Sequence, residues 1–278
     1  MVKKPWRKIL YEEQNYPDNY VDESFLYELK KNVYTRNYHF WIVSNEAGRV
    51  SQQFSSLCLF VMCFVYMKQE CISPSVLFLM SVMVTSISYF IYLFISWEGT
   101  QMKVQDDLKS FVLFLAFSFG LSPILRTLTD SISTDTIYAM TICMLGMNLI
   151  MHDYGASGAI VSKAASLNTA IFGSVCLASR LPSSWHAFVT VILAVEIFAL
   201  FPVFRETLKT FCPRSQPFMT WSLLLIALVS VLTISLLAGV FFVLAQSALM
   251  FLCPYWLVRL QRYKDNIHGP WDEAVIST

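Results

Sequence analysis

Three cations at the borders of apolar segments, Lys163, Arg205 and Lys209, are the residues best suited to binding chemistry. A long basic side chain near the end of a membrane helix can extend to the headgroup layer and hold a lipid phosphate through charge-assisted hydrogen bonds. Two alternatives need no ligand. Lys163 can reach the interface simply because its charge avoids hydrocarbon, and Arg205 and Lys209 can serve only to orient the chain. These three are therefore candidate lipid-phosphate contacts.

The chain lacks the residue patterns with which proteins usually bind a nucleotide diphosphate. It contains no D-x-D pair, no G-x-G-x-x-G or G-x-x-x-x-G-K-S/T loop, no H-E-x-x-H and no E-x7-E pair. Such patterns place a metal, a helix N-terminus or a carboxylate against the reacting group. The seven cysteines show no C-x-x-C spacing, which argues against a zinc site or a disulfide framework. We expect no catalytic residue, no cofactor and no metal site.

A polar C-terminal run at residues 266–274 carries a second set of candidate binding residues. Its Gly-Pro turn would expose Trp271, and an exposed aromatic side chain flanked by polar groups is typical of an interface anchor. The candidate partner-docking residues are His268, Pro270, Trp271 and Asp272. A metal site from His268, Asp272 and Glu273 is the alternative, which is disfavoured because no further ligand clusters with them.

These candidates belong to a chain that is too apolar to fold in water. Of its 278 residues, 56% are hydrophobic and 14% charged, whereas soluble domains average about 25% charged residues. Because about 20 apolar residues cross the hydrocarbon core as a helix, residues 52–258 predict an all-α, polytopic membrane bundle. The eight expected transmembrane helices cover residues 50–67, 74–96, 108–126, 136–152, 156–179, 184–204, 218–238 and 240–258. The last two must fold back within one apolar stretch, which we expect near Gly239; six or seven helices remain the alternative.

The distribution of Lys and Arg predicts the orientation of these helices. Sixteen of the twenty lie before the first helix, in alternate loops or after the eighth helix, whereas only Lys68, Arg126 and Arg180 lie in the opposite loops. Because cytosolic loops carry the excess of basic residues, both termini are predicted to be cytosolic. The expected regions are a cytosolic N-terminal segment at 1–49, a transmembrane domain at 50–258 and a cytosolic tail at 259–278. The net charge of +1 gives no general affinity for nucleic acid.

Local patterns predict how some helices begin and end. Residues 22–33 are expected to form an amphipathic helix that lies on the bilayer or docks on a partner. Ser133 or Thr134 is a good N-cap for the helix that follows, with Asp135 facing its positive end. His152 and Asp153 are expected to form an interfacial cap where the fourth membrane helix ends.

Several short runs, spread in order from residue 16 to residue 274, resemble the PIG-C family, which supplies one membrane component of phosphatidylinositol N-acetylglucosaminyltransferase. The runs are Tyr16–Asp22, Leu121–Pro123, Thr127–Thr129, Ser131–Met140, Asp153–Ala156, Ser166–Asn168, Cys176–Pro182 and Asn266–Ala274. The most specific are Ser131–Met140 and Asn266–Ala274. The resemblance covers nearly the whole chain.

The resemblance implies a subunit of an endoplasmic reticulum membrane complex that transfers N-acetylglucosamine from UDP-N-acetylglucosamine to phosphatidylinositol. This transfer is the first step of glycosylphosphatidylinositol (GPI) anchor synthesis. In that complex the sugar-nucleotide chemistry belongs to the catalytic A component, and the H, P, Q and Y components are further partners. We therefore expect a non-catalytic, multi-pass subunit that assembles the transferase and presents phosphatidylinositol. The alternatives are a transporter or scramblase that moves lipid or a small solute through its own bundle, and an autonomous membrane transferase.

Overall fold

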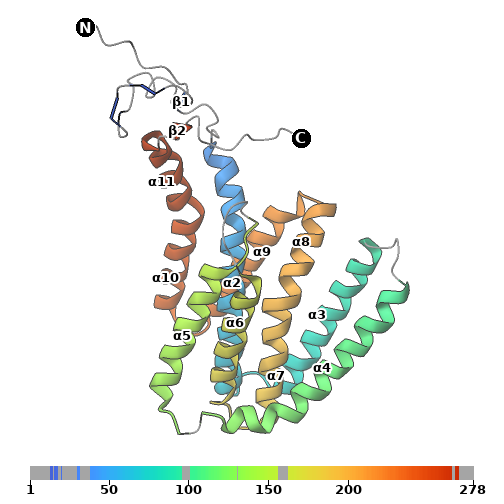
Figure 1. Cartoon of the computed structure of the whole chain (residues 1–278). Helices are drawn as coiled ribbons and strands as arrows, with labels where there is room; N and C mark the ends of the chain where they lie inside the picture. The colour runs from blue at the N-terminus through green and yellow to red at the C-terminus, as the bar shows by residue number, and fades with distance from the viewer. Residues whose placement is uncertain are drawn as a thin grey trace, which may run out of the picture. The chain divides into compact units, whose positions relative to one another are not determined.

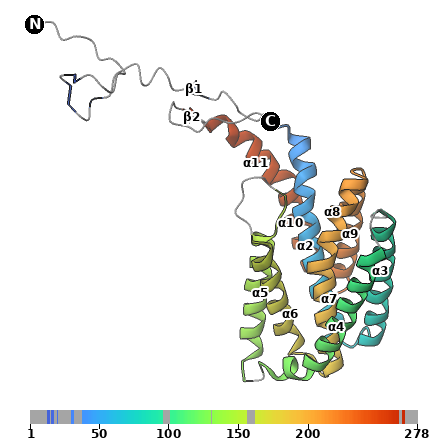
Figure 2. The ribbon, with the colours of Figure 1, turned by 45° about the vertical axis from the view of Figure 1, so that its right-hand side comes forward.

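The computed structural model describes residues 13–14, 16–17, 20, 30–31, 38–95, 101–129, 131–155, 162–264 and 267–268. The chain forms two compact units, one of Val43–Pro254 and one of Met1–Ile42 with Tyr255–Thr278. The helices in chain order are α2 (Phe40–Lys68), α3 (Pro74–Ile95), α4 (Gln101–Thr127), α5 (Thr134–Met151), α6 (Lys163–Ala178), α7 (Ser184–Val195), η1 (Glu196–Leu200), α8 (Phe201–Phe211), α9 (Ser215–Leu232), α10 (Leu236–Ser247), η2 (Ala248–Leu252), α11 (Cys253–Leu260) and η3 (Gln261–Tyr263). The expected all-α bundle is confirmed by the unit Val43–Pro254 (Figures 1 and 2).

The other unit contributes one short antiparallel strand pair. Strand β1 (Lys30–Lys31) lies against β2 (Ile267–His268), with Lys30 opposite His268. β1 is the described part of the segment in which we expect an amphipathic helix, and the rest of residues 22–33 lies outside the described residues. The expected division into regions 1–49, 50–258 and 259–278 stays a prediction.

Seven helices among the described residues are long and apolar enough to cross a membrane. They are Phe40–Lys68, Pro74–Ile95, Val104–Thr127, Thr134–Met151, Ser184–Phe211, Ser215–Leu232 and Leu236–Tyr263. Helix α6 has 16 residues, which rise about 24 Å and fall short of a hydrocarbon core of about 30 Å; residues 156–161 before it lie outside the described part. The chain is thus a polytopic membrane protein, as expected.

The two ends of the unit Val43–Pro254 meet at one side of the bundle. Pro254 has no backbone N–H to donate to Met250 four residues earlier, and the Met250 carbonyl instead accepts the Ser44 hydroxyl at 2.8 Å. Successive long helices alternate in direction (Figure 1), so only an even number of passes brings Ser44 and Met250 together. This favours eight passes, with α6 as the shortest. The cytosolic placement of the termini stays a prediction.

Helix α2 begins ten residues before the boundary expected from hydropathy. The reason is that polar residues of its first turns are bonded to distant parts of the bundle, so this segment belongs to the bundle although it is not apolar. Ser44 donates to the Met250 carbonyl at 2.8 Å, and Arg49 donates to the Tyr154 carbonyl. The polar residues that follow are bonded in the same way: Ser51–Gln246 at 2.7 Å, Gln52–Thr220 at 2.8 Å and Gln53–Asn148 at 3.0 Å. A hydropathy pattern cannot distinguish such residues from a solvated segment.

The expected fold-back at Gly239 is wrong by about one helical turn. Helix α9 ends at Leu232, and Ser235 caps α10 by accepting the Ala238 amide at 3.3 Å. A serine hydroxyl satisfies a free helix N–H, which glycine cannot do. Gly239 lies buried within α10, where an added Cβ would collide with the Leu232 side chain. Its role is to let α9 and α10 approach closely.

Helix α7 forms the centre of the bundle. Helices α3 and α4 instead expose apolar side chains on the outside of the bundle. Every residue of Ala187–Ala194 is buried, and the core around them includes Phe60 and Phe198, whose rings meet edge to face at 5.3 Å. By contrast, Phe90 and Phe94 on α3 are 71% and 75% exposed. Exposed phenylalanines on a helix of this length are suited to lipid or to another membrane protein.

The predicted start of the helix after Ser133 is confirmed. Ser133 is the N-cap of α5, and its hydroxyl accepts the Thr136 amide at 3.3 Å. Asp135 lies in the first turn, where a carboxylate interacts favourably with the helix dipole.

Candidate functional site

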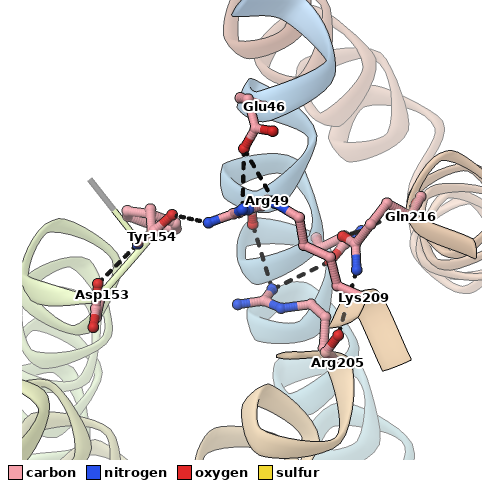
Figure 3. Close-up of polar contacts among 9 residues, drawn as sticks. Glu46, Arg49, Asp153, Tyr154, Arg205, Lys209 and Gln216 are labelled. Carbon is pink, nitrogen blue, oxygen red and sulfur yellow. Dashed lines mark hydrogen bonds and ion pairs between the residues drawn. The ribbon is translucent and has the colours of Figure 1, made fainter. Parts of the chain in front are cut away.

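Charged and polar side chains from five helices gather at one end of the unit Val43–Pro254 (Figure 3). They come from the first turns of α2, the end of α5 and the loop after it, the start of α6, α8 and the start of α9. The ten residues are Glu46, Arg49, Gln52, His152, Asp153, Tyr154, Lys163, Arg205, Lys209 and Gln216. We call this set the polar cluster.

Arg205 of α8 is the buried centre of the polar cluster. It is 6% exposed. Its Nη1 donates to the Gln52 Oε1 at 3.3 Å and to the Arg49 carbonyl at 3.5 Å, and its Nη2 lies 3.0 Å from the His152 Nε2. All three acceptors are neutral, and within the described ranges no carboxylate forms an ion pair with Arg205. A buried charge without a counter-charge is costly, so this position favours an anion nearby.

His152 is held as a neutral acceptor for this guanidinium. It is 8% exposed at the end of α5, and its burial together with the nearby Arg205 charge lowers the pKa of the imidazole to about 4. At neutral pH the ring therefore carries no charge, and its Nε2 can accept from Arg205. His152 is the C-cap residue of α5, as expected, and its side chain in addition turns into the bundle and contacts Arg205.

The outer layer of the polar cluster consists of ion pairs. Glu46 contacts Arg49 at 3.1 Å and Lys209 at 3.5 Å, so one carboxylate is shared by two cations. Asp153 contacts Lys163 at 3.2 Å. Exposed ion pairs of this kind contribute about 0–1 kcal/mol each, which means that the cations can exchange these partners for another anion at little cost.

The loop after α5 fits closely around Arg49. The Arg49 guanidinium donates to the Tyr154 carbonyl. Gly155 follows with φ +76°, a left-handed conformation that favours glycine, and an added Cβ there would collide with the Arg49 guanidinium. Asp153 accepts the Gly155 amide at 2.8 Å, and this bond, assisted by Lys163, lowers the pKa of its carboxyl group. The loop thus joins Arg49 and Lys163 to the cluster.

A second set of neutral bonds positions Arg205 through α9. Gln216 of α9 donates from its Nε2 to the Arg205 carbonyl at 3.4 Å, and Gln52 donates to Gln216 and to Thr220. Gly48 allows this approach, because an added Cβ would lie 3.1 Å from the Thr220 Oγ1. The amide and hydroxyl groups fix the guanidinium without neutralising it.

The cluster has four cations, Arg49, Lys163, Arg205 and Lys209, and two carboxylates, Glu46 and Asp153. Its net positive charge and its fork of guanidinium donors suit an anion, a phosphate group above all. Among the described residues no group of three His, Cys, Asp or Glu could hold a metal ion. The excess of cations therefore supports binding of an anion.

The structure brings all three sequence-predicted cations, Lys163, Arg205 and Lys209, into this one cluster. Lys163 is not two turns inside a helix but begins α6, and it is 74% exposed. Of the predicted docking residues, only the backbone of His268 is described, in β2, and Pro270, Trp271 and Asp272 lie outside the described residues.

Sequence reasoning missed Arg49, Glu46 and the role of His152. The polar surroundings of Arg49 place it in the expected cytosolic segment, outside the bundle. The available signal is the run of Ser51, Gln52 and Gln53 directly after it, because three polar side chains leading into an apolar helix need partners within the bundle.

Comparison with known proteins gives a consistent result. The GPI2 family, described as phosphatidylinositol N-acetylglucosaminyltransferase, matches residues 6–272. The chain is similar to the C subunit of phosphatidylinositol N-acetylglucosaminyltransferase from Homo sapiens, with 48% identity over 98% of this chain and 93% of the relative. It is 37% identical to the putative C subunit from Dictyostelium discoideum (99% and 81% covered) and 33% identical to the GPI2 subunit of Schizosaccharomyces pombe (99% and 87%). No solved structure matches the chain.

Proposed function

Because the chain belongs to the GPI2 family of phosphatidylinositol N-acetylglucosaminyltransferase subunits, we propose that it is a membrane subunit of that transferase. The complex moves N-acetylglucosamine from UDP-N-acetylglucosamine to phosphatidylinositol and so begins GPI-anchor synthesis. We assign the chain to the endoplasmic reticulum membrane, with the A, H, P, Q and Y components of the complex as partners. Its role is to assemble the complex and to present phosphatidylinositol, while the A component carries the sugar-nucleotide chemistry.

The observation that carries the lipid-presenting role is the buried, uncompensated charge of Arg205. The guanidinium is 6% exposed and contacts only neutral acceptors. Arg49 and Lys209, which share Glu46, belong to the outer layer of the same cluster. By the distribution of basic residues, this end of the bundle is the predicted cytosolic side, where the phosphodiester of phosphatidylinositol lies.

The polar cluster would bind this phosphodiester by exchange of partners. Arg49 and Lys209 turn from the shared Glu46 to the phosphate oxygens, and Lys163 does the same from Asp153. Arg205 stays fixed by Gln52 and contributes its charge from the buried side. A hydrogen bond to a charged group contributes about 1.5–3 kcal/mol, so loss of one cation is expected to weaken lipid binding about tenfold or more.

The test is a titration of phosphatidylinositol in transferase assays on the purified complex. We expect Arg205→Gln to raise the KM for phosphatidylinositol about tenfold or more, while the KM for the sugar nucleotide and the amount of assembled complex stay unchanged. Arg214→Gln is the matched control, because it removes an exposed cation from the loop that follows α8. An unchanged lipid KM in Arg205→Gln would refute the lipid-presenting role and leave only the assembly role.

The tail at residues 266–274 is proposed to bind another component of the complex through Trp271. A buried tryptophan anchor typically contributes about 2 kcal/mol or more. Trp271→Ala should therefore lower co-purification of a partner more than about tenfold at limiting concentration, without lowering the abundance of this chain. Val275→Ala, just beyond the run, is the control. If co-purification persists in Trp271→Ala, or if zinc restores what the variant loses, the docking role is wrong.

A further inference from the structure

An apolar groove of about 660 Å³ runs along the bundle between α2 and α5. Its lining includes Phe54, Val61 and Phe64 from α2 and Ile142, Gly146 and Leu149 from α5. The two helices also meet through polar contacts, such as the 3.0 Å bond from Gln53 to Asn148. This bond joins the two helices that form the walls of the groove.

One end of the groove lies next to residues that contact the polar cluster. Leu149 lines the groove, and its carbonyl accepts the Tyr154 hydroxyl at 2.6 Å. On the opposite wall, Arg49 precedes Phe54 by five residues of α2, which is a rise of about 7.5 Å. On α2 the apolar lining is thus followed by Arg49, a cation of the polar cluster.

The other end of the groove is crossed by a polar contact. Lys68 at the end of α2 donates to the Tyr138 hydroxyl on α5, and both residues line the groove. The lysine also lies over the Tyr138 ring, 5.0 Å from its centroid. The apolar groove therefore has the polar cluster near one end and the Lys68–Tyr138 contact at the other.

The dimensions of the groove fit a single hydrocarbon chain. From Phe54 to Gln69 the α2 wall rises about 22 Å, which exceeds one leaflet of about 15 Å, half of the hydrocarbon core. A helix of about 10 Å diameter and this length would need about 1,700 Å³, more than twice the space present. The volume lies within the range of about 300–1,000 Å³ that is usual for small-molecule sites.

We propose that the groove binds one acyl chain of a phosphatidylinositol molecule whose phosphate lies at the polar cluster. This inference rests on the proposed function and extends it by naming where the lipid tail lies. The excess of cations at one end and the apolar wall beyond it complement a lipid with a negatively charged headgroup. A zwitterionic lipid such as phosphatidylcholine would gain less from Arg49 and Arg205.

Fixing the acyl chain also fixes the height of the headgroup. The glycerol ester would lie between Phe54 and Arg49, and the inositol ring would extend beyond the cluster at the membrane surface. Presentation of the acceptor then follows from the position of the lipid, with no movement of the helices required.

Gly146 offers a way to block the groove without disturbing the bundle. It lines the groove, and an added Cβ there would meet no atom within 4 Å. Gly120 on α4 also has open space around an added Cβ and does not line the groove. Leucine is a better helix former than glycine, so both Gly146→Leu and Gly120→Leu are expected to fold.

The experiment uses the purified complex in nanodiscs of phosphatidylethanolamine with a phosphatidylinositol probe that carries a photoreactive diazirine on one acyl chain. We expect crosslinks on α2 and α5 at groove residues, such as Val61 and Ile142. Unlabelled phosphatidylinositol should compete, whereas phosphatidylcholine should not. Gly146→Leu should reduce these crosslinks about tenfold, as loss of about two buried methylene groups would, and Gly120→Leu should not.

The outcomes separate this inference from the proposed function. Equal crosslinking in Gly146→Leu, or equal competition by phosphatidylcholine and phosphatidylserine, would overturn the acyl-chain site, because the groove would then hold bulk lipid. The lipid titration of Arg205→Gln would still test the headgroup site independently. If phosphatidylserine alone competes as well as phosphatidylinositol, the groove is an anionic-lipid site and the assignment to phosphatidylinositol fails.

Discussion

The two ends of the bundle each hold an arginine without a carboxylate partner among the described residues, and they use it differently. At one end, the Nη2 of Arg180 donates to the carbonyls of Thr129 at 2.6 Å and Ile132 at 2.9 Å. At the other end, Arg205 contacts the side chains of Gln52 and His152 and lies among further cations. Both arginine side chains donate hydrogen bonds to other segments of the bundle, but only Arg205 lies in a cluster with excess positive charge.

This difference indicates two roles for the same residue type. Backbone carbonyls are strong hydrogen-bond acceptors, so Arg180 is compensated by the α4–α5 turn, which it joins to the α6–α7 connection. Arg205 receives less compensation, from one backbone carbonyl at 3.5 Å and two neutral side chains, and three further cations lie in its cluster. The first arginine stabilises the fold, and the second is available to an external anion. The predictions below test this division, from the largest effect on stability to the smallest.

Arg180→Met should destabilise the chain most. It leaves the carbonyls of Thr129 and Ile132 without their donor, and two bonds to a charged group contribute about 4 kcal/mol together. The melting temperature in detergent should fall by about 10 °C, while the lipid KM of the folded fraction stays unchanged. A normal melting temperature would show that Arg180 does not hold the two turns together.

Acidification should destabilise the wild-type chain through His152. Its pKa is lowered from 6.5 to about 4 in the folded chain, so the unfolded chain binds the proton more readily. His152 therefore makes its full contribution to the free energy of unfolding above about pH 6.5. This contribution, about 3 kcal/mol, is lost as the pH falls toward 4.

Melting curves across this pH range test the assignment. His152→Gln keeps an acceptor for Arg205 and removes the titrating group, so its curve should be flatter than that of the wild type. His39→Gln, which changes an exposed histidine, should retain the wild-type slope. An unchanged slope in His152→Gln would exclude His152 as the titrating group.

Gly155→Ala should have a smaller effect that is confined to the polar cluster. A side chain at φ +76° costs about 1–2 kcal/mol, and its Cβ would displace the Arg49 guanidinium from the Tyr154 carbonyl. We expect a rise of a few-fold in the lipid KM and a small loss of thermal stability. Gly146→Ala, a change within a helix with open space around it, is the control and should not lower thermal stability.

Arg205→Met should change stability least, although the position is buried. The variant loses the bonds to Gln52 and His152 but also removes the cost of burying an uncompensated charge. We expect these effects to offset each other, so the melting temperature should change by about 2 °C or less. A loss as large as that of Arg180→Met would mean that Arg205 is also a structural residue, and the contrast between the two ends would disappear.

The membrane helices are predictable from sequence because hydropathy and capping are local signals. The cap at Ser133 and the start of α3 at Pro74 agree with expectation within one residue. The start of α2 is not predictable in this way, because Ser44 and Arg49 belong to the bundle through bonds to distant residues. Glycine often marks a turn, which is the reason to expect the fold-back at Gly239, whereas a serine cap makes the turn earlier.

The candidate site is predictable in part. Lys163, Arg205 and Lys209 stand out because a cation near a membrane helix end is unusual, and this signal is local. Their mutual proximity, the burial of Arg205 and the participation of Arg49 and His152 depend on contacts between residues more than 50 positions apart. Such contacts leave no periodic pattern in one sequence.

The most direct test of the central claim, that the polar cluster holds phosphatidylinositol through Arg205, is to count the lipid that stays bound. Native mass spectrometry of the complex, extracted in mild detergent from membranes that contain phosphatidylinositol, reports bound lipid for wild type, Arg205→Gln and Arg214→Gln. We predict one retained phosphatidylinositol for each copy of this chain in the wild type and in Arg214→Gln, and its loss in Arg205→Gln. Equal retention in all three would contradict the account.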